Sequence, residues 1–142
     1  MLFVVWRKRT AEASFRRSTD VVVDLAARFG EGVGVCHVVE VTATPPDARV
    51  RRAFVDFLRC GVIKHISVTY EGAGFKAAAV RAVMTGAFEL SQPSAKHAVH
   101  GDLETAAKWH ALAQASLQRS ESAATMTAIV RSMRRLLSER SP

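Results

Sequence analysis

Cysteine is scarce in this chain of 142 residues, which contains only Cys36 and Cys60. Two cysteines this far apart form neither a CxxC redox motif nor the framework of a disulfide-rich domain. We interpret both as core thiols, because a free cysteine behaves as a small apolar side chain. The fold must therefore be held together without disulfides.

Long hydrophobic runs are also absent. The longest, Met1–Trp6, is far shorter than the roughly 20 residues that a membrane-spanning helix needs. The basic residues Arg7 to Arg9 follow this run, whereas a secretory signal places positive charge before its apolar region. We therefore expect a cytoplasmic protein without a transmembrane helix.

Acidic residues are outnumbered, with 13 Asp and Glu against 20 Lys and Arg and a net charge of +7. Such an excess is found in proteins that bind nucleic acids or anionic membranes. Charge alone is weak evidence, however, and the 49% apolar content is typical of an ordinary globular domain. We therefore disfavour nucleic acid as a partner. A possible basic patch for another anionic partner lies on the second predicted helix: Arg49, Arg51, Arg52 and Arg59.

Apolar segments alternate between strand-like and helix-like patterns along residues 1–117. This β-α-β-α-β-α-β-α order predicts one α/β domain with a four-stranded, mainly parallel sheet. Leu2–Trp6 is apolar on both faces, as expected of a central strand, which suggests that a further strand precedes it. Strands are predicted at 2–6, 33–41, 63–70 and 96–100, each followed by a helix, at about 10–29, 47–60, 75–90 and 103–117.

The remaining residues, 118–142, are predicted to form a linker and an amphipathic helix. Such a helix exposes an apolar stripe that soluble proteins rarely leave uncovered. It could pack on its own domain, pair with a second copy in a homo-oligomer, or lie on a membrane surface. The small number of basic residues disfavours the membrane. The stripe consists of Met126, Ile129, Val130, Met133, Leu136 and Leu137.

At the centre of the chain, a buried strand, a glycine turn and a helix follow one another between Ile63 and Met84. In α/β proteins the carboxyl end of a strand is the usual place for a ligand or partner site. The turn Gly72-Ala73-Gly74-Phe75-Lys76-Ala77 fits the GxGxxA pattern of dinucleotide sites, but it lies at the third strand-to-helix junction instead of the first. We therefore expect no nucleotide or other cofactor there. The helix carries an apolar series at helical spacing: Phe75, Ala79, Ala82 and Val83.

No catalytic or metal-binding constellation stands out. His97 and His100 fall on opposite faces of the predicted strand, so their HxxH spacing does not converge on a metal. His37 shares a face with neighbouring valines and is interpreted as a core histidine. An enzyme would require His37 or His65 to meet a carboxylate that the sequence does not locate. We therefore expect no enzymatic activity.

The central turn resembles that of a known family. In element order, size and the segment Tyr70–Arg81, the chain looks like the STAS domain of bacterial anti-sigma-factor antagonists. It is more similar still to a group of uncharacterised STAS-like, or SpoIIAA-like, bacterial proteins, over about residues 2–115. The resemblance implies a regulatory signalling module that binds an unknown protein partner through this turn: Glu71, Gly72, Ala73, Gly74, Phe75 and Lys76.

The resemblance also has departures. The antagonists carry Asp-Ser-Ser-Gly at this turn, where a kinase phosphorylates the second serine. Aligned on Gly74, Glu71 takes the place of the acid, whereas Gly72 and Ala73 replace the serines, so the phosphorylation switch cannot operate there. The family also has a strand before the one that begins here at Leu2. Without such a strand, the segment Met1–Trp6 would be exposed for pairing.

The SpoIIAA-like relatives imply an alternative function, the carriage of a small apolar or lipid-like ligand. A carrier needs an enclosed apolar pocket of several hundred cubic ångströms. A protein-binding site at the turn should instead leave Phe75 exposed. The three-dimensional structure distinguishes these two expectations.

Overall fold

A computed structural model describes residues 1–9, 11–30, 32–117 and 121–139. The predicted α/β class is confirmed, with a four-stranded sheet and five helices in this part of the chain. None of these helices is long and apolar enough to cross a membrane. The elements are β1 (Leu2–Trp6), α1 (Glu12–Phe29), β2 (Val33–Val39), α2 (Ala48–Leu58), β3 (Ile63–Tyr70), α3 (Gly74–Ser91), β4 (Lys96–His100), α4 (Leu103–Ala115) and α5 (Ala123–Glu139).

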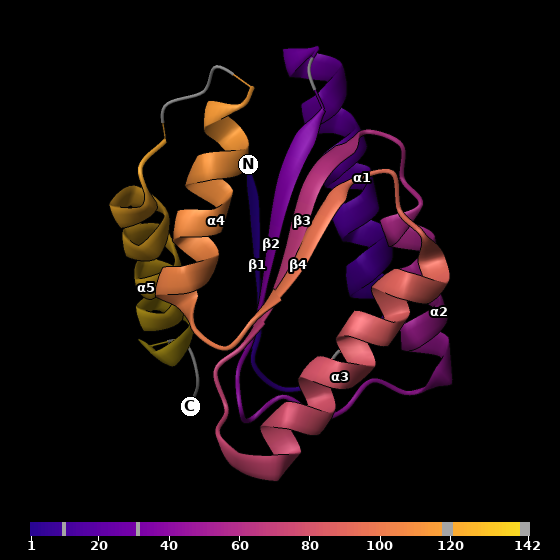
Figure 1. Ribbon diagram of the computed structural model, residues 1–142, viewed down its shortest axis with the longest axis vertical. Coiled ribbons are helices and arrows are strands. Elements are labelled where there is room, and N and C mark those ends of the chain that lie inside the picture. The colour runs from indigo at the N-terminus through magenta and orange to yellow at the C-terminus, as the bar shows by residue number, and fades with distance from the viewer. Residues whose placement is uncertain (10, 31, 118–120, 140–142) are drawn as a thin grey trace.

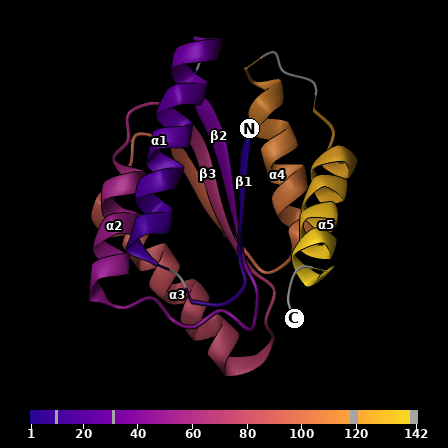
Figure 2. The ribbon, with the colours of Figure 1, turned by 180° about the vertical axis from the view of Figure 1, so that it is seen from behind.

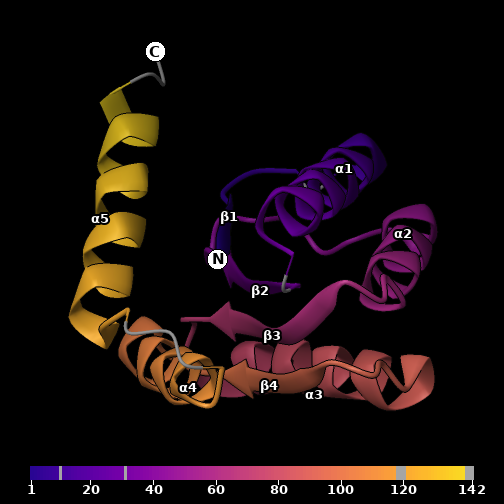
Figure 3. The same cartoon turned by 90° about the horizontal axis from the view of Figure 1, so that it is seen from above.

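The strands lie in the sheet in chain order, and each neighbouring pair is parallel. Right-handed crossovers that all step in the same direction place their helices on one face of a sheet. Accordingly, α1, α2 and α3 cover one face, and α4 and α5 lie on the other (Figure 1). Figure 3 shows α5 beside α4, on the opposite side of the molecule from α1 and α2.

Local sequence signals define the helix ends. The residue after α1, Gly30, has a φ of 72°, in the left-handed region that glycine tolerates best. Asp47 accepts hydrogen bonds from two backbone N–H groups in the first turn of α2. The carboxylate of Asp102 accepts one from Thr105 N at 2.7 Å, which caps α4. Residue types that favour helix ends therefore lie at these three positions.

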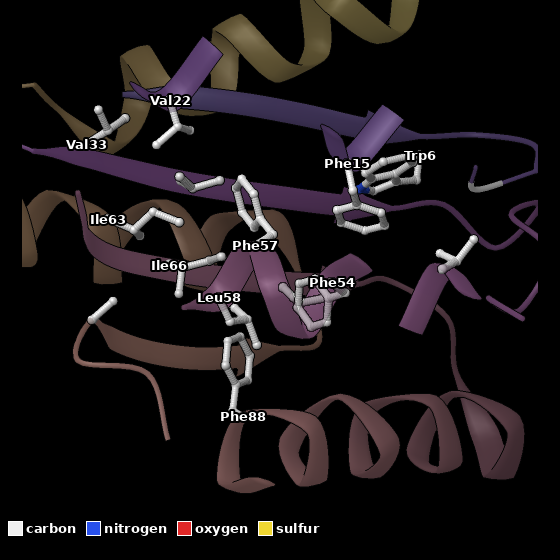
Figure 4. Close-up of a cluster of buried hydrophobic side chains, with 14 residues drawn as sticks. Trp6, Phe15, Val22, Val33, Phe54, Phe57, Leu58, Ile63, Ile66 and Phe88 are labelled. Atoms are coloured by element: carbon white, nitrogen blue, oxygen red, sulfur yellow. The ribbon is translucent and has the colours of Figure 1, made fainter. Parts of the chain in front are cut away.

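The larger core lies between the sheet and helices α1 to α3 (Figure 4). Trp6 of β1 stacks on Phe15 of α1 with ring centroids 4.7 Å apart. Burial of each large apolar side chain contributes about 1.5–3 kcal/mol, so this cluster is a main source of stability. Its ten labelled members come from all three helices and three strands: Trp6, Phe15, Val22, Val33, Phe54, Phe57, Leu58, Ile63, Ile66 and Phe88.

Two predictions about strands are wrong. β1 is an edge strand of the described sheet, not a central one. It is apolar on both faces because the larger core covers one face and the residues around Val130 of α5 cover the other. β2 ends at Val39 instead of Val41, because the chain turns at Glu40, whose carbonyl accepts a hydrogen bond from Ala43 N.

Gly34 of β2 should tolerate no side chain. A Cβ atom at this position would lie 2.1 Å from Nε2 of His65. We expect Gly34→Ala to lower the free energy of unfolding by roughly 1–3 kcal/mol through overpacking, as measured by urea denaturation. Gly86 of α3 is the control, because a Cβ there meets no atom within 4 Å. Gly86→Ala should raise stability by about 0.5–1 kcal/mol, and equal effects at both sites would contradict this interpretation.

Candidate partner-binding surface

The carboxyl ends of three strands are joined by ion pairs. Arg7 follows β1, Glu40 follows β2 and Glu71 follows β3, and in a parallel sheet these ends meet at the same side. Nε of Arg7 lies 3.1 Å from Oε2 of Glu40. Nε of Arg134, in α5, lies 3.2 Å from Oε1 of Glu40, and the same guanidinium also pairs with Glu71. One arginine of the C-terminal helix therefore pairs with carboxylates from two strand ends.

This network also attaches α5 to the sheet. Its four side chains are only 15–31% exposed, so solvent and salt screen the charges less than on an open surface. A second polar contact joins Arg7 Nη2 to Ser138 Oγ of α5 at 2.8 Å. The segment predicted to pair with the domain, with a second copy or with a membrane thus has specific contacts to its own domain.

The apolar stripe of α5 is only partly covered by this packing. Met126 and Val130 are buried, and Val130 contacts a small cluster on the α4 side of the sheet. Residues 118–120 and 140–142 of the predicted extension lie outside the described part of the chain. The other members of the stripe are half-buried or exposed: Met133, Ile129, Leu136 and Leu137.

The predicted binding turn divides into a held part and an exposed part. Glu71 and Gly72 are half-buried, and Arg81 holds the turn by donating to the carbonyls of Tyr70 and Gly72 at 3.3 and 3.2 Å. The side chain of Glu71 is bound by α5. The remaining four predicted residues are exposed: Ala73, Gly74, Phe75 and Lys76.

Phe75 is 90% exposed and begins an apolar stripe along the outer face of α3. Val83 and Leu90 are 55% and 83% exposed, and the three alanines of the stripe, which lie between Phe75 and Val83, are exposed too. The apolar series predicted on this helix therefore faces solvent, while Ala77 and Phe88 face the sheet. A helix that is apolar on both faces is atypical of a protein surface. The stripe consists of Phe75, Ala78, Ala79, Ala82, Val83 and Leu90.

The four arginines of the predicted basic patch do not form one positive surface. Arg49 and Arg52 line an open groove of about 430 Å³ between α1 and α2, but Glu12 and Asp56 line it as well. The groove therefore has mixed charge. Arg51 instead donates to the carbonyl of Pro46, and Arg59 does not line this groove.

A buried polar cluster under α4 was not predicted. Oγ of Ser67 lies 2.8 Å from Nε2 of His110 and 3.7 Å from Sγ of Cys36. The His110 ring also lies 5.1 Å from the His65 ring, centroid to centroid. These groups lie on different elements, so no spacing in the sequence brings them together. The alternation of His65, Ser67 and Thr69 on β3 was the available signal, because it marks a polar face on an otherwise apolar strand.

The arrangement around Ser67 does not suit nucleophilic catalysis. Ser67 and His110 are both fully buried, so a substrate has no access to the hydroxyl. Nδ1 of His110 has no hydrogen-bond partner in the described part of the chain, so no acid orients the imidazole as a triad requires. Burial raises the pKa of the Cys36 thiol to about 11, which keeps it protonated and unreactive.

His37 is a core histidine, as interpreted from the sequence. Trp6 Nε1 donates to its Nδ1 at 2.8 Å, which assigns the ring proton to Nε2. Burial lowers the pKa of His37 to about 3, so the ring is neutral at physiological pH. No ion pair with a carboxylate is formed by His37 within the described ranges. Likewise, the described residues contain no group of histidines, cysteines and acids suited to a metal ion.

Comparisons of the chain with protein-family models, curated proteins and solved structures found no match. The resemblance to STAS-like proteins therefore stays a prediction.

Arg134 should contribute more to stability than its neighbour Arg131. Arg134→Ala leaves Glu40 and Glu71 partly buried without their shared cation, and we expect a loss of about 2 kcal/mol in the free energy of unfolding. Arg131→Ala is the control on the same helix, because its pair with Glu104 is exposed and should contribute less than about 1 kcal/mol. Similar losses in urea denaturation would show that the network does not hold α5.

Acid should destabilise the fold through its buried histidines. Burial lowers the pKa of His37 from 6.5 to about 3, and burial together with the nearby His65 and His100 lowers that of His110 from 6.5 to about 3. Below pH 6.5 the unfolded chain binds protons that the native state does not. Unfolding free energy should therefore fall by about 1.4 kcal/mol per pH unit for each histidine. Urea midpoints between about pH 7 and pH 5 measure this, and His37→Gln should remove about half of the dependence if both contribute equally.

Proposed function

We propose that this chain is a non-enzymatic, STAS-like regulatory or scaffolding module. It binds a protein partner through the exposed part of the turn at Glu71–Phe75 and the outer face of α3. The observation that carries the proposal is the 90% exposure of Phe75 at the start of an apolar helix face. A bacterial signalling role and a cytoplasmic location belong to the same proposal.

The chemistry of α3 favours a helical partner. Exposed aromatic side chains are frequent anchors of protein interfaces. The alanines that follow Phe75 leave a shallow surface on which the backbone of another helix can approach closely. An amphipathic helix could therefore place its own apolar residues between Phe75 and Leu90, at the two ends of the stripe.

The first turn of α3 offers polar contacts beside Phe75. Its N-cap residue, Ala73, makes no side-chain hydrogen bond, and the first turn contains no acid. The free N–H groups and the positive end of the helix dipole suit an acceptor from the partner. Exposed Lys76 adds positive charge at the same place. We therefore expect an acidic or polar residue in the partner segment that lies beside Phe75.

The network at Glu71 gives the turn a fixed position. Because Arg134 binds Glu71 and Arg81 binds two carbonyls of the turn, Phe75 projects from a rigid junction. Binding at a rigid site costs less conformational entropy than binding at a mobile loop. Control by phosphorylation at the aligned serine position is not part of the proposal, since Ala73 has no hydroxyl.

The carrier alternative has less support. The grooves between α1 and α2 and along β1 are open to solvent and contain arginine side chains. A carrier of an apolar ligand needs an enclosed, mainly apolar pocket. Neither groove meets this requirement.

Phe75→Asp should abolish partner binding without unfolding the domain. The side chain is exposed, and an acid in the first turn of a helix is favourable, so the thermal midpoint should stay within a few degrees. Affinity capture from native cells, followed by mass spectrometry, compares wild type, Phe75→Asp and Phe29→Asp. Phe29, at the end of α1, is a matched exposed phenylalanine at 69%.

The expected result is a set of partners lost only with Phe75→Asp. Retention of every partner by this variant, or equal losses with Phe29→Asp, would contradict the assignment of the α3 surface. A large fall in the thermal midpoint of Phe75→Asp would instead show that Phe75 supports the fold.

A further inference from the structure

A groove of about 410 Å³ runs along the outer edge of β1. All of β1 lines it, and Ser14, Ser18 and Val21 of α1 line it as a column at helical spacing. Figure 2 shows β1 between α1 and α5, with its outer edge uncovered by either helix. The groove therefore follows a strand edge and has a helix as one wall.

The backbone of β1 presents unpaired groups to this groove. Trp6 O accepts a hydrogen bond from Glu40 N at 2.9 Å, so the polar groups of Trp6 point toward β2. Because alternate residues of a strand direct their N–H and C=O groups to the same side, those of Phe3 and Val5 point to the groove. In the described sheet β1 has β2 as its only neighbour, so these four groups are available for an added strand.

Positive charge gathers at the carboxyl end of the same edge. Arg7, Arg9 and Arg17 line the groove, and no acidic side chain does. Arg7 is neutralised by Glu40, but Arg9 and Arg17 form no ion pair within the described part of the chain and are exposed. The charge of Arg9 also acts on the nearby carboxylate of Asp47, the N-cap of α2. An occupant with a carboxylate at this end would therefore meet Arg17, which forms no ion pair in the described part of the chain, and Arg9 beside Asp47.

We propose that the edge of β1 binds an extended segment of a partner protein as a fifth strand, with acidic residues beside Arg9 and Arg17. Pairing with five residues of β1 spans roughly 17 Å, and the backbone bonds to Phe3 and Val5 would supply much of the affinity. A second copy of this chain fits less well. Pairing through its own β1 would bring only the residues that line this groove, and none of them is an acid that could meet Arg9 and Arg17. This site lies at the opposite edge of the sheet from β4, against which α3 packs, and is independent of the function proposed above.

The probe is a fluorescein-labelled peptide of about eight residues, in which valine and threonine alternate before two terminal aspartates. Fluorescence anisotropy against the full chain should show saturable binding. The variant Arg9→Ala/Arg17→Ala should raise the Kd about tenfold, and a peptide that ends in two asparagines should show the same weakening. Arg59→Ala, which removes an arginine outside the groove, should leave the Kd unchanged.

Proline at two neighbouring positions tests the backbone contacts. Val5→Pro removes an N–H that points to the groove, which an edge strand tolerates, and should abolish peptide binding while the fold remains. Val4→Pro removes an N–H that bonds to β2 and should destabilise the sheet. A peptide N-methylated only at the residues that face β1 should also lose binding, whereas methylation at the alternate residues should have little effect. The two methylated peptides therefore test the backbone contacts even if Val5→Pro does not fold.

Three results would overturn the proposal. They are an undetectable interaction with the aspartate peptide, a Kd unaffected by the two arginine substitutions, and equal binding of both methylated peptides. A dimer in light scattering that Val5→Pro converts to a monomer would assign the edge to a second copy and would also overturn it.

Discussion

A parallel sheet that is apolar on both faces has to be covered on both faces, and the rest of this structure depends on that constraint. The three crossovers leave α1, α2 and α3 on one side. The other side of β1 and β2 is covered by α4 and α5, through Leu103 and Val130. Because α5 completes this layer, the C-terminal helix is part of the packed domain in the described structure.

The same helix controls the chemistry at the strand ends. In many α/β proteins this side of the sheet binds a ligand, but here Arg134 occupies it and pairs with Glu40 and Glu71. The groups proposed to bind partners lie at the two edges of the sheet. Phe75 and the apolar face of α3 lie toward β4, and the unpaired edge of β1 lies on the other side. Together the two proposals place two partners on one domain, one by helix packing and one by strand addition.

The buried polar cluster has a different consequence. Ser67, His110 and Cys36 place hydroxyl, imidazole and thiol groups between the sheet and α4, where an apolar core would pack at lower cost. Their contacts require one position of α4 relative to β3. Because His110 stays neutral to about pH 3, the cluster adds specificity to the packing at neutral pH and makes the fold sensitive to acid.

The sequence by itself determined the class of the fold, because hydrophobic periodicity and capping residues such as Gly30 and Asp102 are local signals. It determined β3 and β4 to the residue, and the face on which His37 lies. Only the tertiary structure decided that β1 is an edge strand and that α3 turns Phe75 to solvent. The sequence pattern of an apolar residue is the same whether the residue is buried in a core or exposed at an interface. It also decided that Arg134 meets Glu71 and that Ser67 meets His110. Those pairs join residues far apart in the chain, and no local pattern records a contact that exists only after the helices have packed on the sheet.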